Sequence, residues 1–196
     1  MFITFEGPEG SGKSSQIKLL AAFLQAQGLS VVTTREPGGT PIGDEIRVCV
    51  HNVANTAMTP IAEMLLYSAS RAQLVETLIR PSLAAGHIVL CDRFADSTIA
   101  YQGYGRGLNL DHLRQVTKIA TGGLQPTLTF LLDIDVKRGL ARRTGGGLEM
   151  NRLDLETVHF HQRVREGYHQ LMMAEPDRWV VLDAERPLAT IQADLQ

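Results

Sequence analysis

The chain contains, near its first residue, a pattern that could hold a polyphosphate. Residues 7–14 read Gly-Pro-Glu-Gly-Ser-Gly-Lys-Ser, so that a lysine and a hydroxyl directly follow a glycine-rich segment. Glycines let backbone N–H groups turn onto phosphate oxygens, and a helix that starts after the loop adds the positive charge of its N-terminus. Lys13 would reach the β- and γ-phosphates, and the Ser14 hydroxyl would bind Mg²⁺. The pattern therefore predicts a site for a nucleoside triphosphate and its metal ion.

A glycine-rich turn without function would explain the glycines, but not the lysine and the hydroxyl at these offsets. The flanking residues also fit, because 2–6 is an apolar run and the apolar residues of 13–27 recur at helical spacing. We call residues 7–14 the P-loop. The residues expected to contact the triphosphate are Gly7, Pro8, Glu9, Gly10, Ser11, Gly12, Lys13, Ser14 and Ser15.

Glu9 is an unusual residue within this loop. Its carboxylate would be repelled by a triphosphate unless it faces elsewhere or helps to hold a cation, so Glu9 is a further candidate ligand of the metal. The alternative is that the middle positions of the loop tolerate most residues. If Glu9 has a function, we expect it to face an acceptor molecule across the loop.

A second group of residues suited to an anion follows the apolar run 87–91. Asp92, Arg93 and Phe94 stand at the C-terminal end of this expected strand, where open α/β sheets bind ligands. An arginine can hold a second phosphate through two N–H groups, and Asp92 could fix Mg²⁺ through water or orient Arg93. The alternative is a pair that serves only stability. Together with the P-loop, this second site indicates phosphoryl transfer between two nucleotides.

Other classes of P-loop protein lack support in the sequence. The chain has no Asn-Lys-x-Asp or Asp-x-x-Gly string of a GTPase, and no Leu-Ser-Gly-Gly-Gln-like signature of a transport ATPase. Two alternatives stay open, namely a kinase for deoxynucleosides and a P-loop regulator that binds a nucleotide without consuming a second one. The first should lack paired phosphate-binding arginines.

The elements that must position these residues alternate along the chain. Short apolar runs stand at 2–6, 30–34, 87–91, 128–133 and 179–183, and helix-patterned stretches stand at 13–27, 60–79, 110–120 and 153–174. This alternation is typical of a parallel sheet covered on both faces, and we expect one α/β domain over 1–196. Three connections have a different chemistry, at 35–43, 92–107 and 138–152, and the last contains three glycines among arginines.

The composition is that of an ordinary globular protein, with 196 residues, 44% of them hydrophobic and 20% charged. The net charge of −2 gives no global field that would attract nucleic acid or anionic lipid, so we expect neither partner. Cys49 and Cys91 stand far apart, without the spacing of a metal site or a disulfide framework. No signal peptide or membrane span is indicated, and we expect a cytoplasmic protein.

The sequence closely resembles bacterial thymidylate kinases along almost its whole length. The resemblance is carried by Phe5-Glu6-Gly7, Arg35-Glu36-Pro37-Gly38-Gly39-Thr40, Asp92-Arg93-Phe94, Ala100-Tyr101-Gln102-Gly103 and Asn151-Arg152-Leu153-Asp154. These enzymes transfer the γ-phosphoryl group of ATP to dTMP, giving dTDP and ADP for dTTP biosynthesis. The resemblance implies ATP and Mg²⁺ as cofactors and a homodimer. It also implies the P-loop kinase fold, with five parallel strands, helices on both faces and a mobile lid at 138–152.

The same resemblance implies which residues bind dTMP. Arg93 would hold its phosphate, Tyr67 would stack on the base, and Tyr101 would close the space beside the deoxyribose C2′. Arg71 and Gln102 would hydrogen-bond the base, because an amide offers the donor and acceptor that match the thymine edge. The full set is Glu9, Arg35, Glu36, Tyr67, Arg71, Arg93, Ser97, Thr98, Tyr101 and Gln102.

Several of these residues also have structural alternatives. Tyr67 and Arg71 are four apart, the spacing of an ordinary surface pair on a helix, and Glu36 could merely balance Arg35. The chain departs from the family at Phe94, where tyrosine is frequent, and at Thr98, where serine is frequent. Neither change removes a group that the expected chemistry needs.

The lid is expected to supply the catalytic arginine, because the P-loop contains none. The expected catalytic residues are Lys13, Arg93, Arg142, Arg143 and Arg152, and the last of these should begin the next helix. Arg138 and Arg142 should share one helix face. A solvated basic stretch is the alternative.

A homodimer interface is expected on the stretch 60–79. Its apolar residues Ile61, Met64, Leu65 and Ala69 should share a face. The alternative is that this face simply packs on the sheet.

Overall fold

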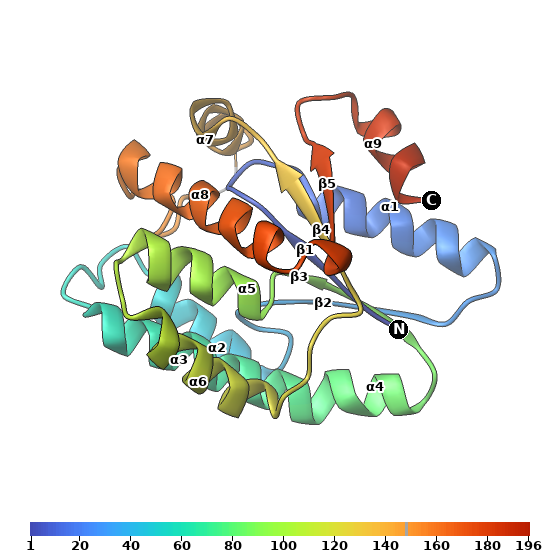
Figure 1. Ribbon diagram of the computed structural model, residues 1–196, viewed down its shortest axis with the longest axis horizontal. Coiled ribbons are helices and arrows are strands. Elements are labelled where there is room, and N and C mark those ends of the chain that lie inside the picture. The colour runs from blue at the N-terminus through green and yellow to red at the C-terminus, as the bar shows by residue number, and fades with distance from the viewer. Residues whose placement is uncertain (148) are drawn as a thin grey trace.

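The computed structural model describes residues 1–147 and 149–196, and within them one sheet of five parallel strands lies at the centre (Figure 1). The strands follow the order β2–β3–β1–β4–β5 and are β1 (Phe2–Glu6), β2 (Val31–Arg35), β3 (Ile88–Asp92), β4 (Leu128–Asp133) and β5 (Trp179–Asp183). The predicted parallel sheet is therefore confirmed. Only β2 and β3 differ, each beginning and ending one residue later than expected.

Different helices cover the two faces of the sheet (Figure 1). Ile3 packs against α1 (Lys13–Ala26) and α9 (Leu188–Leu195) on one face. Phe2 packs on the opposite face, with residues of α3 (Pro60–Leu74). Burial on both faces explains why the inner strands read as continuous apolar runs.

The stretch 60–79 forms a helix that continues beyond its expected end. α3 passes through a π-helical segment (Val75–Ile79) into α4 (Arg80–Ala84). Its start follows the usual signals, because the Thr59 side chain accepts a hydrogen bond from the backbone N–H of Ala62.

The face of α3 that was expected to be continuous is divided. Ile61 and Leu65 are exposed, whereas Met64 is buried. Met64 and Leu65 are consecutive, so their side chains point to different sides of the helix, and Met64 packs in the core with Ile99 and Leu113.

Two of the connections that were expected to lack regular structure, 35–43 and 92–107, contain helical residues. The first contains the start of α2 (Pro41–His51), which is capped by the side chain of Thr40. The second folds into α5 (Ala95–Thr98) and a π-helical segment (Ile99–Gly105) rather than a loop. Glycines at 103 and 105 weaken the helical signal locally, but packing against neighbouring helices outweighs propensity.

The lid region also differs from expectation. α7 (Val136–Gly145) occupies its first half, and α8 (Val158–Ala174) begins only after the capping residue Thr157. Arg152 therefore lies in a turn before α8 instead of beginning a helix at 153. The N-cap explains the later start, since the Thr157 side chain accepts the backbone N–H of Phe160.

A further helix, α6 (Leu110–Thr121), packs against α3. Among the described residues, no helix combines the length and the apolar character needed to span a membrane. The strands all point the same way, so the segments after β1, β2 and β3 meet at one edge of the sheet (Figure 1). The residues singled out in the sequence lie in these segments.

Candidate functional site

A cavity of about 520 Å³ opens at this edge of the sheet. We call it the acceptor cavity. It is lined by the P-loop, by the segments that follow β2 and β3, by α2 and α3, and by residues of the lid. All ten residues expected to bind dTMP line it, namely Glu9, Arg35, Glu36, Tyr67, Arg71, Arg93, Ser97, Thr98, Tyr101 and Gln102. The fold thus brings together side chains that are scattered over the chain.

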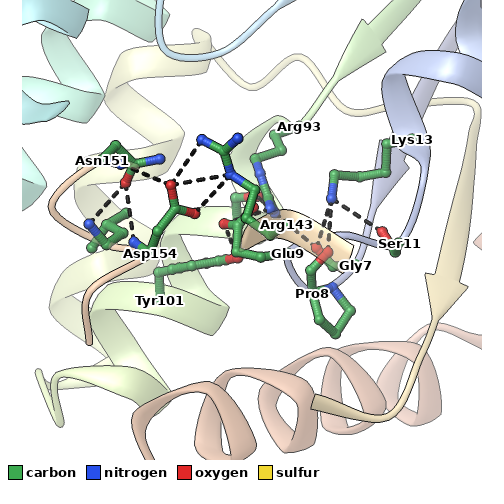
Figure 2. A network of polar contacts seen from close by, with 12 residues as sticks. Gly7, Pro8, Glu9, Ser11, Lys13, Arg93, Tyr101, Arg143, Asn151 and Asp154 are labelled. Atoms are coloured by element: carbon green, nitrogen blue, oxygen red, sulfur yellow. Dashed lines mark hydrogen bonds and ion pairs between the residues drawn. The ribbon is translucent and has the colours of Figure 1, made fainter. Parts of the chain in front are cut away.

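The P-loop adopts its conformation through tight backbone contacts. Gly10 has a φ of +69°, and a Cβ there would lie 2.0 Å from the carbonyl oxygen of Gly139 in α7. Only glycine allows this approach of the loop to the first turn of the lid helix. Lys13 turns back over the loop, and its Nζ donates to the carbonyl oxygens of Gly7 at 3.1 Å and Pro8 at 2.9 Å (Figure 2).

Burial makes the Lys13 ammonium easier to deprotonate. Loss of solvent, together with the charge of nearby Arg93, lowers the pKa of the Lys13 ammonium to about 8. A bound polyphosphate would supply the negative charge that holds this proton. Binding of a polyphosphate would therefore raise the pKa of Lys13 again.

Ser14 and Asp92 are the groups best suited to Mg²⁺. The Ser14 Oγ donates to Asp92 Oδ2 at 2.5 Å, which joins the first turn of α1 to the end of β3. A hydroxyl and a carboxylate are oxygen ligands of the kind that Mg²⁺ prefers beside phosphates. Asp92 makes no contact with Arg93 among the described hydrogen bonds and ion pairs, so the expected role of orienting Arg93 has no support in the geometry.

Arg93 lines the acceptor cavity and has an unusual backbone conformation. Its φ of +70° is rare for a residue with a side chain, and such strain tends to persist where function requires it. The Nη1 atom donates to the Gly7 carbonyl oxygen at 3.0 Å and to the Tyr168 hydroxyl at 2.9 Å. The Nη2 atom donates to Glu9 Oε1 at 2.9 Å.

Glu9 faces across the P-loop toward Arg93 (Figure 2). Its Oε1 also accepts a hydrogen bond from the Tyr101 hydroxyl at 2.8 Å. Burial alone would raise the pKa of Glu9, but the charges of Arg93 and Lys13 outweigh it and lower that pKa to about 2. The carboxylate is ionised at neutral pH.

A buried polar group behind Arg93 was not predicted as part of the site. Glu6 accepts hydrogen bonds from the Ser97 hydroxyl at 2.6 Å, the Tyr168 hydroxyl at 2.8 Å and the Phe94 backbone N–H at 2.8 Å. Burial, reinforced by the nearby carboxylate of Asp96, raises the pKa of Glu6 to about 7. The family resemblance of Phe5-Glu6-Gly7 was the only signal in the sequence that pointed to Glu6.

Arg71 lies beneath the acceptor cavity and is only 2% exposed. Its guanidinium donates to Glu36 at 2.8 Å, to the Thr98 hydroxyl at 2.8 Å and to the Phe94 carbonyl oxygen at 2.9 Å. Glu36 therefore pairs with Arg71, and the alternative that it balances Arg35 is wrong. Nη2 also lies 2.6 Å from Glu36 Oε2, and only one of the two N–H groups on Nη1 has a described partner, which leaves a donor for a ligand.

The expected base-binding side chains come from two helical segments. Tyr67 on α3 is 9% exposed, and its hydroxyl has no hydrogen-bond partner among the described residues. Gln102, in the π-helical segment, is 2% exposed, and its Nε2 donates to Glu63 Oε1 at 2.8 Å. The ring of Tyr101 lies beside Arg93, whose guanidinium carbon is 5.0 Å from the ring centroid.

Two further basic groups at the cavity were missed because α2 was not predicted. Arg47 donates from Nη1 to the Pro37 carbonyl oxygen at 2.9 Å, and it lies beside Arg35. His51 also lines the cavity, and burial together with the charge of Arg47 lowers its pKa to about 4. His51 is thus neutral at pH 7. Arg35 is half exposed and pairs with Asp44.

The three lid arginines expected to be catalytic have different surroundings. Arg142 and Arg143 line the acceptor cavity, whereas Arg152 is not among its lining residues. Arg142 donates to the Ala184 carbonyl oxygen at 2.7 Å, and Arg143 forms a two-pronged ion pair with Asp154 (Figure 2). Arg138, on the same side of α7 as Arg142, pairs with Glu185.

Comparisons with known proteins agree over the whole chain. The family model described as thymidylate kinase matches residues 5–195. The thymidylate kinase of Roseiflexus sp. (strain RS-1) is 53% identical, covering 97% of this chain and 89% of that protein. The one from Deinococcus radiodurans is 52% identical, with coverages of 100% and 94%. The crystal structure of thymidylate kinase from Ehrlichia chaffeensis superposes with a TM-score of 0.82 at 32% identity, covering 100% of this chain and 96% of that chain.

Proposed function

The chain belongs to the thymidylate kinase family, and on this basis we propose which of its residues perform each part of the reaction. It is an ATP-dependent nucleoside monophosphate kinase that transfers the γ-phosphoryl group of ATP to dTMP. The product dTDP serves nucleotide biosynthesis. The single observation that carries the assignment of residues is the position of Arg93, which lines the cavity and donates to the Gly7 carbonyl oxygen of the P-loop.

We assign the phosphate of dTMP to Arg93. A guanidinium matches a phosphate with two parallel N–H groups, and this one is already neutralised in part by Glu9. Tyr168 and Ser97 support it from behind, and both are tied to Glu6. The arginine is therefore preorganised, and little side-chain entropy is lost when the phosphate binds.

Transfer then depends on positioning and charge rather than on a general base. The second pKa of a phosphate monoester is about 6, so the attacking oxygen is mostly ionised at neutral pH. Lys13 and the N–H groups of the P-loop hold the triphosphate, and Arg93 brings the acceptor phosphate to it. Such alignment of two anions is the principal term in phosphoryl transfer.

Ser14 and Asp92 would hold the Mg²⁺ ion, which would neutralise the negative charge that develops on the phosphates of ATP. Glu9 is a weaker candidate for this role, because its carboxylate is already paired with Arg93. The lid arginines Arg142 and Arg143 would add positive charge when the lid closes over ATP.

We assign the selection of dTMP to the cavity residues that come from α3 and from the π-helical segment. Tyr67 would stack on the base, and Arg71 with Gln102 would read its polar edge. Tyr101 fills the space near Arg93, and its bulk would exclude a ribose 2′-hydroxyl.

We further propose a cytoplasmic homodimer. Exposed apolar side chains support the dimer, with Ile61 58% exposed, Leu65 51% and Ile119 81%. Ile61 and Leu65 lie on α3 and Ile119 on α6, helices that pack side by side. The two thiols of Cys49 and Cys91 are unpaired in the described structure, as is usual in a reducing compartment.

Calorimetric binding of two ligands tests the assignment of Arg93. The parent protein should bind dTMP much more tightly than thymidine, which lacks the phosphate. In Arg93→Ala the affinity for dTMP should fall to about that of thymidine, while thymidine binding changes little. Equal losses for both ligands would show that Arg93 does not act through the phosphate. Arg114→Ala, which breaks an exposed ion pair with Asp111, is the control.

A further inference from the structure

A buried carboxylate lies directly behind the side chain that is expected to read the base. Glu63, on α3, is 1% exposed, and its Oε1 accepts a hydrogen bond from Gln102 Nε2 at 2.8 Å. Arg106 donates to the same carboxylate from Nε at 3.2 Å and from Nη2 at 3.1 Å, and Arg152 donates to its Oε2. Three side chains from separate segments thus converge on Glu63.

The charge of Glu63 determines how the Gln102 amide is oriented. Burial would raise the pKa of Glu63, but the hydrogen bonds from Arg106 and Gln102 outweigh it and lower that pKa. The carboxylate is ionised at neutral pH and can only accept hydrogen bonds. Gln102 must therefore turn its NH₂ group toward Glu63.

The opposite end of the amide is then available to a ligand. Gln102 lines the acceptor cavity, and among the described residues no donor forms a hydrogen bond with its Oε1. With the NH₂ group fixed against Glu63, the site offers an acceptor and not a donor at this point. An acceptor is complementary to a base whose ring nitrogen carries a hydrogen.

We propose that Glu63 is a positioning residue for base selection, which fixes the Gln102 amide with its oxygen toward the cavity so that the site accepts N3–H pyrimidines and rejects cytosine. Thymine carries a hydrogen on N3, whereas N3 of cytosine is an acceptor that would face the Gln102 oxygen. Such a mismatch leaves two acceptors opposed, and sites built on hydrogen bonds reject partners strongly in this way. The inference rests on the proposed base-reading role of Gln102.

Of the three described side chains that donate to Glu63, only Gln102 depends on this carboxylate alone. Arg106 has a second carboxylate in Glu156, which its Nη1 contacts at 2.5 Å, and Arg152 also donates to the Val50 carbonyl oxygen at 3.2 Å. Gln102 Nε2 has no other acceptor among the described hydrogen bonds. Glu63 is thus the group that decides which end of this amide faces the cavity.

The test compares dTMP with dCMP as acceptor in the parent and in Glu63→Gln. Glutamine at 63 can present either a carbonyl oxygen or an NH₂ group, so the Gln102 amide can turn over and donate to N3 of cytosine. We expect the ratio of kcat/KM for dTMP to that for dCMP to fall by about tenfold or more, the size of one misplaced polar contact. Effects of Arg152 on the donor side act on both acceptors and cancel in this ratio.

Three variants make the outcome decisive. Glu156→Gln removes the other carboxylate of Arg106 without touching Gln102, and it should keep the parental ratio. Glu63→Asp keeps an acceptor-only group and should keep most of the selectivity. If Glu63→Gln does not fold, the double variant Glu63→Gln with Arg152→Gln also removes the buried cation that is left without a carboxylate, and the same ratio is measured.

Two results would overturn the inference for different reasons. An unchanged ratio in Glu63→Gln, together with a reduced ratio in Gln102→Ala, would show that Gln102 reads the base without help from Glu63. An unchanged ratio in Gln102→Ala as well would show that the proposed base-reading role is itself wrong. A lower ratio in both, with Glu156→Gln at the parental value, supports the proposal.

Discussion

Arg93 and Glu9 form an ion pair across the P-loop, with Nη2 2.9 Å from Oε1, although 84 positions separate them in the chain. Both side chains are less than a fifth exposed. The pair joins the two anion sites expected from the sequence, because Glu9 belongs to the triphosphate loop and Arg93 to the end of β3. Glu9 thereby fixes the orientation of the guanidinium that is proposed to receive dTMP.

Glu9→Gln should therefore impair the acceptor side of the reaction. Loss of the charge weakens the hold on Arg93 and on the Tyr101 hydroxyl, and kcat/KM for dTMP should fall by about tenfold or more. The KM for ATP should change little. Steady-state kinetics with each substrate varied in turn measures both values, and Glu76→Gln, in an exposed pair with Arg80, is the control. Parental kinetics in Glu9→Gln would favour the interpretation that this loop position tolerates most residues.

The affinity for ATP should depend on pH through Lys13. The pKa of its ammonium is about 8 in the free protein, and bound phosphate raises it. Lys13 is thus charged below pH 8 whether or not ATP is bound, and binding is at its strongest there. Above pH 8 affinity should fall by up to about tenfold per pH unit, until the pKa of the bound state is reached.

Calorimetry between pH 7 and 9.5 follows this change. Lys13→Arg keeps its charge throughout this range, so its affinity should be nearly flat with pH. If the affinity for ATP fell with the same slope in both proteins, a group other than Lys13 would be responsible for the pH dependence.

Tyr101 offers a matched pair of variants for sugar selection. Tyr101→Phe keeps the ring beside Arg93 but loses the hydroxyl that donates to Glu9. Tyr101→Ala removes both. We expect the preference for dTMP over its ribose counterpart to persist in the phenylalanine variant and to fall in the alanine variant, because bulk excludes the 2′-hydroxyl. Equal selectivity in Tyr101→Ala and the parent would refute the steric role.

At least one of the lid arginines Arg142, Arg143 and Arg152 should lose far more turnover than ATP affinity when changed to alanine. Arg142 is the strongest candidate, since it lines the cavity and its described contact is one backbone carbonyl oxygen. Single-turnover rates and ATP affinity separate the two effects. Near-parental turnover in all three variants would mean that another cation stabilises the transition state.

Sedimentation tests the proposed homodimer. The parent protein should sediment as a dimer, and Leu65→Glu should shift it to the monomer, because the charge replaces one of the exposed apolar side chains on α3 that are proposed to form the interface. Leu29→Glu alters an exposed leucine between α1 and β2 and is the control. A parent protein that is monomeric at micromolar concentration would contradict the proposal.

The sequence predicted those parts of the fold and site that depend on local patterns. The P-loop follows from a strand, a glycine-rich turn and a helix that are adjacent in the chain, so its geometry is encoded within residues 2–27. The five strands were evident because burial on both faces requires continuous apolar runs. The residues expected to bind dTMP also line one cavity, although their individual roles rest on family resemblance.

Long-range partners could not be read from the chain. Tyr168 donates to Glu6 across 162 positions, and Gln102 donates to Glu63 across 39 positions. The residues around one partner of such a pair carry no information about where in the chain the other partner stands. The helical segment around Tyr101 was missed for a related reason. Its glycines lower the helical signal, and packing against α8 restores the structure.

A product assay with Mg²⁺, ATP and a panel of acceptors tests the central claim most directly. Chromatography of the mixture after incubation with dTMP, dCMP, dGMP, dAMP or thymidine reports which acceptor gains a phosphoryl group. The protein should convert dTMP to dTDP with one ADP formed for each, and the other acceptors should react far more slowly. Absence of dTDP, or a preference for thymidine over dTMP, would contradict the account.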